Sequence, residues 1–227
     1  MDDVLILGYG YTGQRVAKRF LARGVRVTAA TQNSEYLHVP GAEMVGINNH
    51  VRLRMLVLYS IPPDGPWDLL APLLSKVKRV VYLSSTAVYG AATTVDERTP
   101  VDPCTRWARA RIEAERKIAE GSWSTLILRL ATIYSPGRGV RESIRQGKYS
   151  LSSNFVSRIH IDGLVTHVEA AMLSDATGAY PKLWRSVCGL NLFSMPARLA
   201  ASLQRFQTDL SEIGCSTSPL LTLLGNR

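Results

Sequence analysis

The sequence has few cysteines and no long hydrophobic run, and these two absences exclude several classes of protein. Its 227 residues include only three cysteines, Cys104, Cys188 and Cys215, and no C-x-x-C pair. An odd number of widely spaced cysteines argues against a disulfide framework and against a zinc site. No apolar run reaches the ~18 residues of a membrane helix, and the acidic start of the chain differs from the basic start of a secretory signal. We therefore expect a cytoplasmic protein with no membrane partner and no metal site.

The sequence also lacks the motifs of two common enzyme classes. A G-x-S-x-G elbow is absent, which argues against a serine hydrolase, and so is the G-x-x-x-x-G-K-[ST] motif of P-loop NTPases. The net charge of +9 suits an anionic ligand or a polyanion. The basic residues are scattered rather than gathered in a dense run, so we expect no nucleic-acid partner.

Short apolar runs alternate with amphipathic segments along the N-terminal half of the chain. The apolar runs are expected to be strands and the amphipathic segments helices. The expected strands are residues 4–7, 25–30, 43–47, 56–61, 79–84 and 124–130, and the expected helices are residues 12–22, 67–74 and 105–119. This alternation implies parallel βαβ units. The pattern therefore predicts an α/β fold with a Rossmann-type, doubly wound parallel sheet.

One expected strand leaves an unusually short connection to the next. Only residues 48–55 separate the strand over 43–47 from its successor. A parallel crossover usually takes ~10–12 residues or more, including its helix. Either this crossover is abbreviated, or residues 43–47 do not form a strand.

The first expected strand ends in a G-x-G-x-x-G motif made by Gly8, Gly10 and Gly13. A position between a buried strand and a helix is what dinucleotide binding requires of this motif. Gly8 allows the tight turn, Gly10 lets the backbone approach the pyrophosphate, and Gly13 lets the helix pack close to the strand. The helix N-terminus, which includes Tyr11 and Thr12, offers N–H groups and a positive dipole end to the phosphates. The motif predicts binding of NAD or NADP.

The end of the second expected strand favours NADP over NAD. Ala30 is followed by Thr31, and no acidic residue precedes Glu35. An acidic residue there would bind the ribose 2′-hydroxyl of NAD and repel the 2′-phosphate of NADP. Arg15 is the nearest candidate cation for that phosphate, although it could equally belong to a solvated helix face.

Four later segments together resemble the extended short-chain dehydrogenases/reductases, and more narrowly the NAD-dependent epimerase/dehydratase family. They read YLSSTAVYG over residues 82–90, DERTP over 96–100, LRLATIYSPG over 128–137 and RIHIDGLV over 158–165. The resemblance runs from Val4 to about Tyr180, and no family pattern follows Lys182. It implies a Rossmann core over residues 1–135 and a small substrate or lid region over residues 136–227.

The catalytic residues of that family are only partly present. The family uses a Ser, a Tyr and a Lys four residues after the Tyr. Ser85 matches the Ser, but Trp107 stands at the Tyr position and Arg111 at the Lys position. An indole has no titratable proton near neutral pH, so Trp107 cannot act as the general acid or base. Arg111 keeps a positive charge that could fix a ribose.

Tyr89 and Tyr134 are candidate replacements for the missing Tyr, because both lie near strand ends expected to face the cofactor. Either could instead be a packing or substrate-contact residue. His160 and His167 lack partners at metal-ligand spacing, so we expect ordinary hydrogen-bonded histidines. Gly163 stands where the family has an Asp that would cap or orient a helix starting there.

These observations define a set of candidate site residues and leave two functions open. The candidate catalytic residues are Ser85, Tyr89 and Arg111. The candidate cofactor contacts are Gly8, Gly10, Tyr11, Thr12, Gly13, Arg15, Thr31, Ser60, Ser84 and Arg111. The first function is an atypical NAD(P)-dependent oxidoreductase acting on a small polar substrate, such as a nucleotide sugar. The second is a non-catalytic NADP-binding sensor or scaffold. A homodimer is an open alternative to a monomer.

Overall fold

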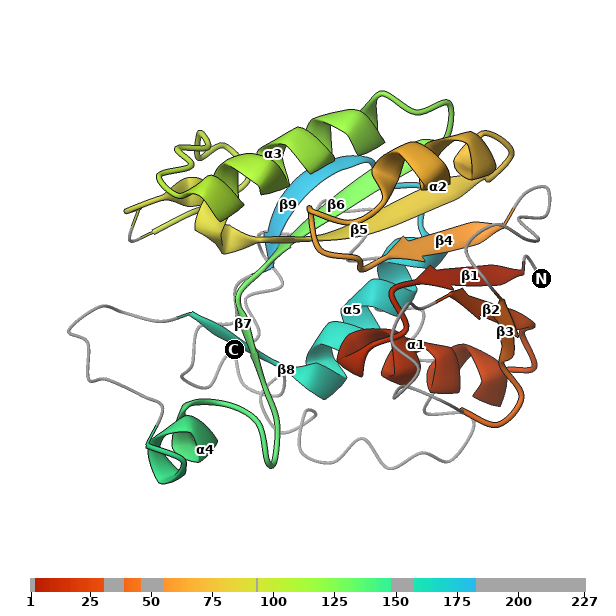
Figure 1. Cartoon of the computed structure of the whole chain (residues 1–227), viewed down its shortest axis with the longest axis horizontal. Coiled ribbons are helices and arrows are strands. Elements are labelled where there is room, and N and C mark those ends of the chain that lie inside the picture. Colours follow the sequence, from red (N-terminus) through yellow and green to blue (C-terminus); the bar gives the residue numbers. More distant parts are fainter. Residues whose placement is uncertain (1–2, 31–38, 46–54, 93, 148–156, 183–227) are drawn as a thin grey trace, which may run out of the picture.

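The computed structural model describes residues 3–30, 39–45, 55–92, 94–147 and 157–182. Within them, one sheet has seven strands in the order β3-β2-β1-β4-β5-β6-β9, and every neighbouring pair is parallel. Figure 1 shows α2 and α3 on one face of this sheet and α1 and α5 on the other. The predicted Rossmann-type, doubly wound α/β fold is confirmed.

The elements follow one another in the order that the sequence pattern predicts, with additions after β6. The strands of the large sheet are β1 (Val4–Leu7), β2 (Val27–Ala30), β3 (Glu43–Val45), β4 (Leu56–Tyr59), β5 (Arg79–Ser85), β6 (Ser124–Leu130) and β9 (Gly178–Lys182). A separate two-stranded ribbon consists of β7 (Thr132–Tyr134) and β8 (Arg158–His160). The helices are α1 (Tyr11–Ala22), α2 (Trp67–Leu74), α3 (Arg106–Ala119), α4 (Val140–Arg145) and α5 (Ile161–Leu173), with a 3₁₀ helix η2 (Thr86–Tyr89) after β5.

The core lies on both faces of the sheet, which explains the unbroken apolar runs in the sequence. Along β1, Val4 and Ile6 belong to the apolar cluster on the side of α1 and α5. Leu5 and Leu7 belong to the cluster on the side of α2 and α3. A strand covered by helices on both faces needs apolar residues at every position rather than at alternate ones.

The short connection after β3 does not remove that strand. β3 pairs in parallel with β2, with Glu43 beside Thr28 and Val45 beside Ala30. The predicted third strand is therefore confirmed, and the alternative that it was misassigned is wrong. Residues 46–54, which lead to β4, lie outside the described residues.

The sheet continues beyond residue 135, where the sequence suggested that the Rossmann core ends. β9 pairs with β6 from Gly178 beside Leu126 to Lys182 beside Leu130. No strand is predicted here from the sequence, and Gly178 and Pro181 are both unusual inside strands. Proline is tolerated at the margin of a sheet, and β9 is the last strand of the described sheet. Residues 183–227 lie outside the described residues.

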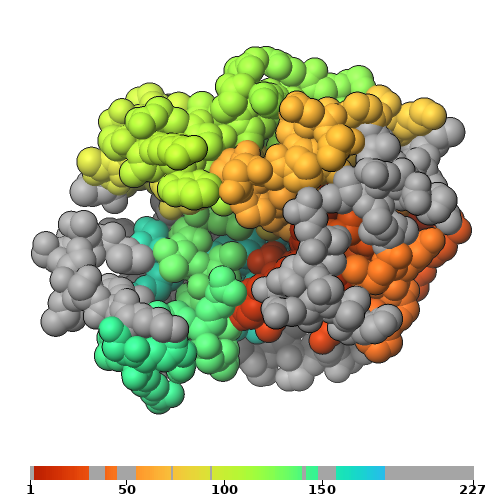
Figure 2. Space-filling view, in the orientation of Figure 1, coloured from red at the N-terminus to blue at the C-terminus, as the bar shows by residue number. Residues whose placement is uncertain are grey.

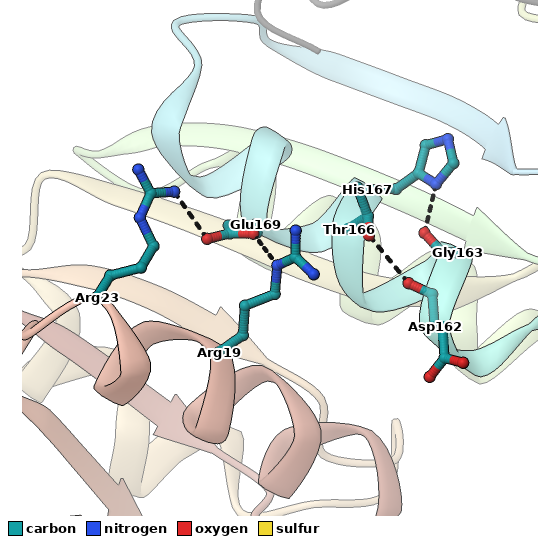
Figure 3. Close-up of polar contacts among 7 residues, drawn as sticks. All are labelled: Arg19, Arg23, Asp162, Gly163, Thr166, His167 and Glu169. Atoms are coloured by element: carbon teal, nitrogen blue, oxygen red, sulfur yellow. Dashed lines mark hydrogen bonds and ion pairs between the residues drawn. The ribbon is translucent and has the colours of Figure 1, made fainter. Parts of the chain in front are cut away.

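A buried carboxylate joins α1 to α5 beneath the sheet. Glu169 of α5 is fully buried and forms ion pairs with Arg19 and Arg23 of α1, the latter at 2.9 Å from Arg23 Nη1 to Glu169 Oε1 (Figure 3). A buried carboxylate is tolerated only when it is paired in this way. The contact fixes α1, which starts at the glycine motif, against α5, which starts directly after β8.

Candidate functional site

The glycine motif lies at the carboxyl edge of the sheet, between β1 and the first turn of α1. The Gly8 N–H donates to Ala30 O at 3.0 Å, and the Ser60 N–H donates to Leu7 O at 2.8 Å. These bonds continue the pairing of β1 with β2 and β4 one residue past the ends of the strands. The strand order reverses here, because the connection after β1 leads to β2 on one side and the connection after β4 leads to β5 on the other. Doubly wound sheets bind nucleotides at such a point.

Each glycine of the motif has the geometry that dinucleotide binding requires. Gly8 has a φ of +94°, and a Cβ on it would lie 2.8 Å from Ser60 Oγ. A Cβ on Gly13 would lie 2.4 Å from Gly8 O, so only glycine lets α1 approach the turn so closely. By contrast, a Cβ on Gly10 would meet nothing within 4 Å. The backbone at Gly10 therefore borders open space, where a pyrophosphate would be in reach of the first amides of α1.

The N-terminus of α1 carries no side-chain cap. Gly10 is its N-cap residue, and no hydrogen bond from a side chain caps the first turn. The first N–H groups of a helix have no partner within the helix, and they attract anions through the helix dipole. The site thus fits the pyrophosphate of NAD or NADP, held by the turn from Gly8 to Gly13.

Tyr11 and Arg15 stack beside this turn. The Arg15 guanidinium lies 3.8 Å from the centre of the Tyr11 ring and donates from Nη1 to Tyr11 O at 2.9 Å. Arg138 lies over the same ring at 4.4 Å, and the Tyr11 hydroxyl bonds to Ser135 Oγ. In Figure 2 the green segment that contains Ser135 accordingly lies beside the red N-terminal turn. Arg15 is therefore held against the turn rather than on a solvated helix face.

The two predicted serine contacts of the cofactor are bonded to the protein itself. Ser60 Oγ donates to Gly8 O at 2.7 Å, so it supports the shape of the turn. Ser84 is buried and donates to Glu115 Oε1 at 2.5 Å. Thr12 lies in the first turn of α1. Thr31 lies outside the described residues, so the end of the second strand remains a prediction.

Ser85, Trp107 and Arg111 lie on β5 and on α3, the helix that packs against it. Ser85 caps η2 by accepting the Ala87 N–H at 3.2 Å, which leaves its hydroxyl proton without a partner among the described residues. Arg111 donates from Nη1 to Leu83 O at 2.9 Å, one turn beyond Trp107 on α3. The Trp107 side chain is 62% exposed. The position of the family's Tyr thus holds an exposed indole.

Tyr89 and Tyr134, the two candidate replacements, differ in accessibility. Tyr89 is only 3% exposed, and its hydroxyl accepts a hydrogen bond from Arg129 Nη1 at 3.0 Å. Arg129 in turn forms an ion pair with buried Glu115 at 2.7 Å. Tyr134 is 38% exposed, and its hydroxyl has no hydrogen-bond partner within the part of the chain that the structure describes. Tyr134 is therefore the more accessible phenol.

The network that joins Ser84, Glu115, Arg129 and Tyr89 was not predicted from the sequence. It connects β5, α3, β6 and η2 through buried side chains. Nearby, burial raises the pKa of the Tyr82 hydroxyl, although the charge of Arg111 acts in the opposite direction. These buried contacts tie the corner behind Ser85 to α3 and β6.

The histidines have local partners, and the helix near Gly163 starts earlier than expected. His160 caps α5 by accepting the Asp162 N–H on Nδ1, and His167 Nδ1 lies 2.5 Å from Gly163 O (Figure 3). The idea that an Asp at 163 would cap the helix is therefore wrong, because α5 begins at Ile161. Among the described residues, no group of His, Cys, Asp and Glu is arranged to hold a metal ion, and no helix is long and apolar enough to cross a membrane.

Comparisons with known proteins agree with this architecture. The model of the NAD dependent epimerase/dehydratase family matches residues 56–178. Protein YeeZ of Escherichia coli strain K12 is 30% identical over 170 residues, an alignment that covers 61% of each chain. A functionally unknown conserved protein from Silicibacter pomeroyi superposes with a TM-score of 0.67 and 28% identity, over 81% of this chain and 72% of the other. The enzyme WbmG of Bordetella bronchiseptica, solved with NAD and UDP, has a TM-score of 0.63 and 16% identity, over 93% of this chain and 78% of its own.

Proposed function

Because the chain belongs to the NAD dependent epimerase/dehydratase family, we propose that it is an NAD(P)-dependent oxidoreductase of the epimerase/dehydratase type. Its substrate is a small polar molecule, and nucleotide sugars are the class to test first, since the structure of WbmG is a complex with NAD and UDP. The observation that carries the proposal is the open space at Gly10 next to the uncapped start of α1.

The residues have separate tasks in this proposal. The turn from Gly8 to Gly13 holds the pyrophosphate, and Arg111 fixes the ribose next to the carboxyl end of β5. The nicotinamide ring, when bound, accepts or donates a hydride. Ser85 donates its free hydroxyl proton to an oxygen of the substrate. Trp107 forms an apolar wall where other members of the family have a proton donor.

We also propose that NADP(H) binds at least as tightly as NAD(H). No acidic residue follows Ala30 to repel a 2′-phosphate. Arg15 lies at the turn and carries a charge that would favour the phosphate. Calorimetric titrations with NADPH and NADH under identical salt conditions test the preference, and clearly tighter binding of NADH would contradict it.

One observation favours a second candidate function, a non-catalytic NADP-binding sensor or scaffold. The indole at position 107 cannot transfer a proton, and the hydroxyl of Tyr89 is buried. Both candidate functions require dinucleotide binding, so turnover must separate them. The protein is incubated with NAD+ or NADP+ and a panel of nucleotide sugars deuterated at the sugar carbinol carbons, and both deuterium at the nicotinamide C4 and any epimerised or dehydrated sugar are followed by mass spectrometry and NMR. Deuterium transfer from any sugar, or its conversion, supports the enzyme, whereas tight cofactor binding with neither result across the panel supports the sensor.

A further inference from the structure

The ribbon of β7 and β8 has one apolar face and one polar face. Ile133 packs against the core and Ile159 is buried in it. Side chains alternate along a strand, so the residues on either side of these two isoleucines point the other way. In the parallel register Thr132 pairs with Arg158 and Tyr134 pairs with His160. These four side chains therefore share the polar face of the ribbon.

The polar face has hydrogen-bond donors that lack acceptors. Arg158 Nε is fully buried without a hydrogen-bond partner, and no carboxylate of the described residues lies within ion-pair distance of this guanidinium. His160 accepts the Asp162 N–H on Nδ1, so its neutral ring carries the proton on Nε2 and can donate it. The Tyr134 ring lies edge-on to His160 at 5.1 Å, and its hydroxyl is free in the described part.

An unmatched guanidinium of this kind is costly unless a ligand supplies the acceptor. A partly buried charge loses hydration and regains the lost free energy only by pairing with an opposite charge. The carboxylate of Asp162 in α5 is 85% exposed at its side chain and lies 3.5 Å from His160 Nδ1, the ring nitrogen opposite the free Nε2. An anion placed between Arg158 and His160 Nε2 would satisfy both donors.

The ribbon adjoins the cofactor site at both ends of β7. At its start, Thr86 Oγ1 of η2 donates to Leu130 O at 3.3 Å, which ties the end of β6 to the corner that follows Ser85. At its end, Ser135 bonds to Tyr11 of the glycine motif. Figure 1 shows the ribbon beyond the carboxyl ends of the central strands, on the left of the molecule. The ribbon therefore lies next to the turn that would hold the cofactor.

We propose that Arg158, with His160 and Tyr134, forms an anion subsite that binds an oxyanion group of the substrate, a phosphate or a carboxylate. The planar fork of a guanidinium suits either group, and the imidazole and phenol donors add hydrogen bonds. The assignment to the substrate rests on the proposed function, whereas the existence of the subsite rests on the geometry of the ribbon alone.

Thermal unfolding of the full-length protein tests the subsite, because a ligand that binds the native state raises its Tm. Inorganic phosphate and sodium glucuronate are titrated separately at fixed ionic strength, with and without saturating NADH. We compare the wild type with Arg158→Met, Tyr134→Phe and the control Arg116→Met, which removes an exposed arginine from α3. At least one anion should raise the Tm of the wild type and of Arg116→Met. Arg158→Met should weaken the binding of that anion at least about tenfold, as expected for losing a charged hydrogen bond. Tyr134→Phe should weaken it about two- to fivefold, as expected for losing a neutral one.

The outcomes separate this inference from the proposed function. An equal response of Arg158→Met and the wild type, or no response of the wild type to either anion, overturns the subsite. Which anion responds identifies the group as phosphate or carboxylate. Fluorescence titration with NADH on the same samples should give equal affinities for Arg158→Met and wild type. A wild type that binds no dinucleotide but shows the Arg158-dependent response would refute the proposed function and keep the subsite. Should Arg158→Met not fold, Arg158→Lys replaces it, with an expected loss of about two- to tenfold.

Discussion

A valine at Gly10 should abolish dinucleotide binding and leave the fold intact. Gly10 has φ −87° and ψ −154°, an extended conformation that branched residues adopt without strain. Its Cβ would meet nothing within 4 Å. As an N-cap, valine stabilises the helix by about 0.5–1 kcal/mol less than glycine does. Valine also lowers the conformational entropy of the unfolded chain, which stabilises the folded state by a similar amount. We therefore expect the free energy of unfolding to change by less than about 1 kcal/mol.

The effect on cofactor affinity should be much larger. The valine would fill the space in front of the first amides of α1, where the pyrophosphate must lie. Each lost hydrogen bond to a charged oxygen costs about 1.5–3 kcal/mol, and losing two of them weakens binding at least about a hundredfold. Calorimetric titration with NADPH and NADH measures this loss, and urea unfolding of the same samples measures stability. A folded Gly10→Val variant that binds with wild-type affinity would refute the assignment of the glycine motif.

Gly13→Ala is the matched control, and unlike Gly10→Val it should lower the stability of the fold. The new Cβ would lie 2.4 Å from Gly8 O and 3.1 Å from Ile6 Cγ2, and a backbone oxygen cannot move aside as a side chain can. Overpacking of this kind costs about 1–3 kcal/mol, against a gain of up to about 1 kcal/mol from the helix propensity of alanine. The variant should lose about 1–2 kcal/mol of stability. Wild-type stability would contradict the close packing of α1 on the turn.

Three further predictions concern other parts of the molecule. Glu169→Gln should lower the free energy of unfolding, measured by urea titration, by about 2–3 kcal/mol. This is somewhat less than the loss expected for a fully buried ion pair, because solvent reaches both arginines. The control Glu120→Gln, which breaks an exposed ion pair, should change it by less than about 0.5 kcal/mol. Burial raises the pKa of Tyr59 above the ordinary value of 10.0. The stability contributed by its neutral form is therefore complete below pH 10 and is lost as the pH rises toward the folded-state pKa. Tyr59→Phe should flatten this alkaline fall in the free energy of unfolding, and an unchanged slope against pH would contradict the reasoning. If turnover is found, Trp107→Phe should reduce kcat/KM by less than about tenfold, because it deletes at most one hydrogen bond. Ser85→Ala should reduce kcat/KM more than Trp107→Phe does. A larger loss in Trp107→Phe than in Ser85→Ala would overturn the assignment of position 107.

The sequence alone was sufficient for the first six strands of the sheet and for the shape of the glycine turn, because both depend on local patterns. The runs over 4–7 and 124–130 became β1 and β6 with the expected limits. Where a strand meets a helix, the spacing of Gly8, Gly10 and Gly13 predicts a tight turn, an open backbone and a closely packed helix. The structure shows these three features at Gly8, Gly10 and Gly13, respectively. The replacement of the family's Tyr by Trp107 was likewise readable, since it follows from a motif counted along one helix.

The accessibility of the candidate side chains was decided only by the tertiary structure. Tyr89 and Tyr134 looked equivalent in the sequence, yet one is buried against Arg129 and the other is exposed. The sequence left Arg15 open between a ligand contact and a solvated helix face, and only the structure shows that its guanidinium stacks on the Tyr11 ring, which Arg138 also contacts. Burial and pairing depend on residues far apart in the chain, so the spacing of nearby residues does not encode them.

The same reason accounts for the features that the sequence did not reveal. Glu169 pairs with Arg19 across 150 residues of sequence, and Tyr11 meets Ser135 across 124. β9 is a strand because β6 offers it an edge to pair with, although its own residues favour other conformations. Arg158 Nε is without an acceptor because the packing of the ribbon brings no acceptor of the described residues within hydrogen-bond distance of it. Local propensities and motifs determined the elements of this protein, whereas the partners of its charged and polar side chains were determined by how those elements pack.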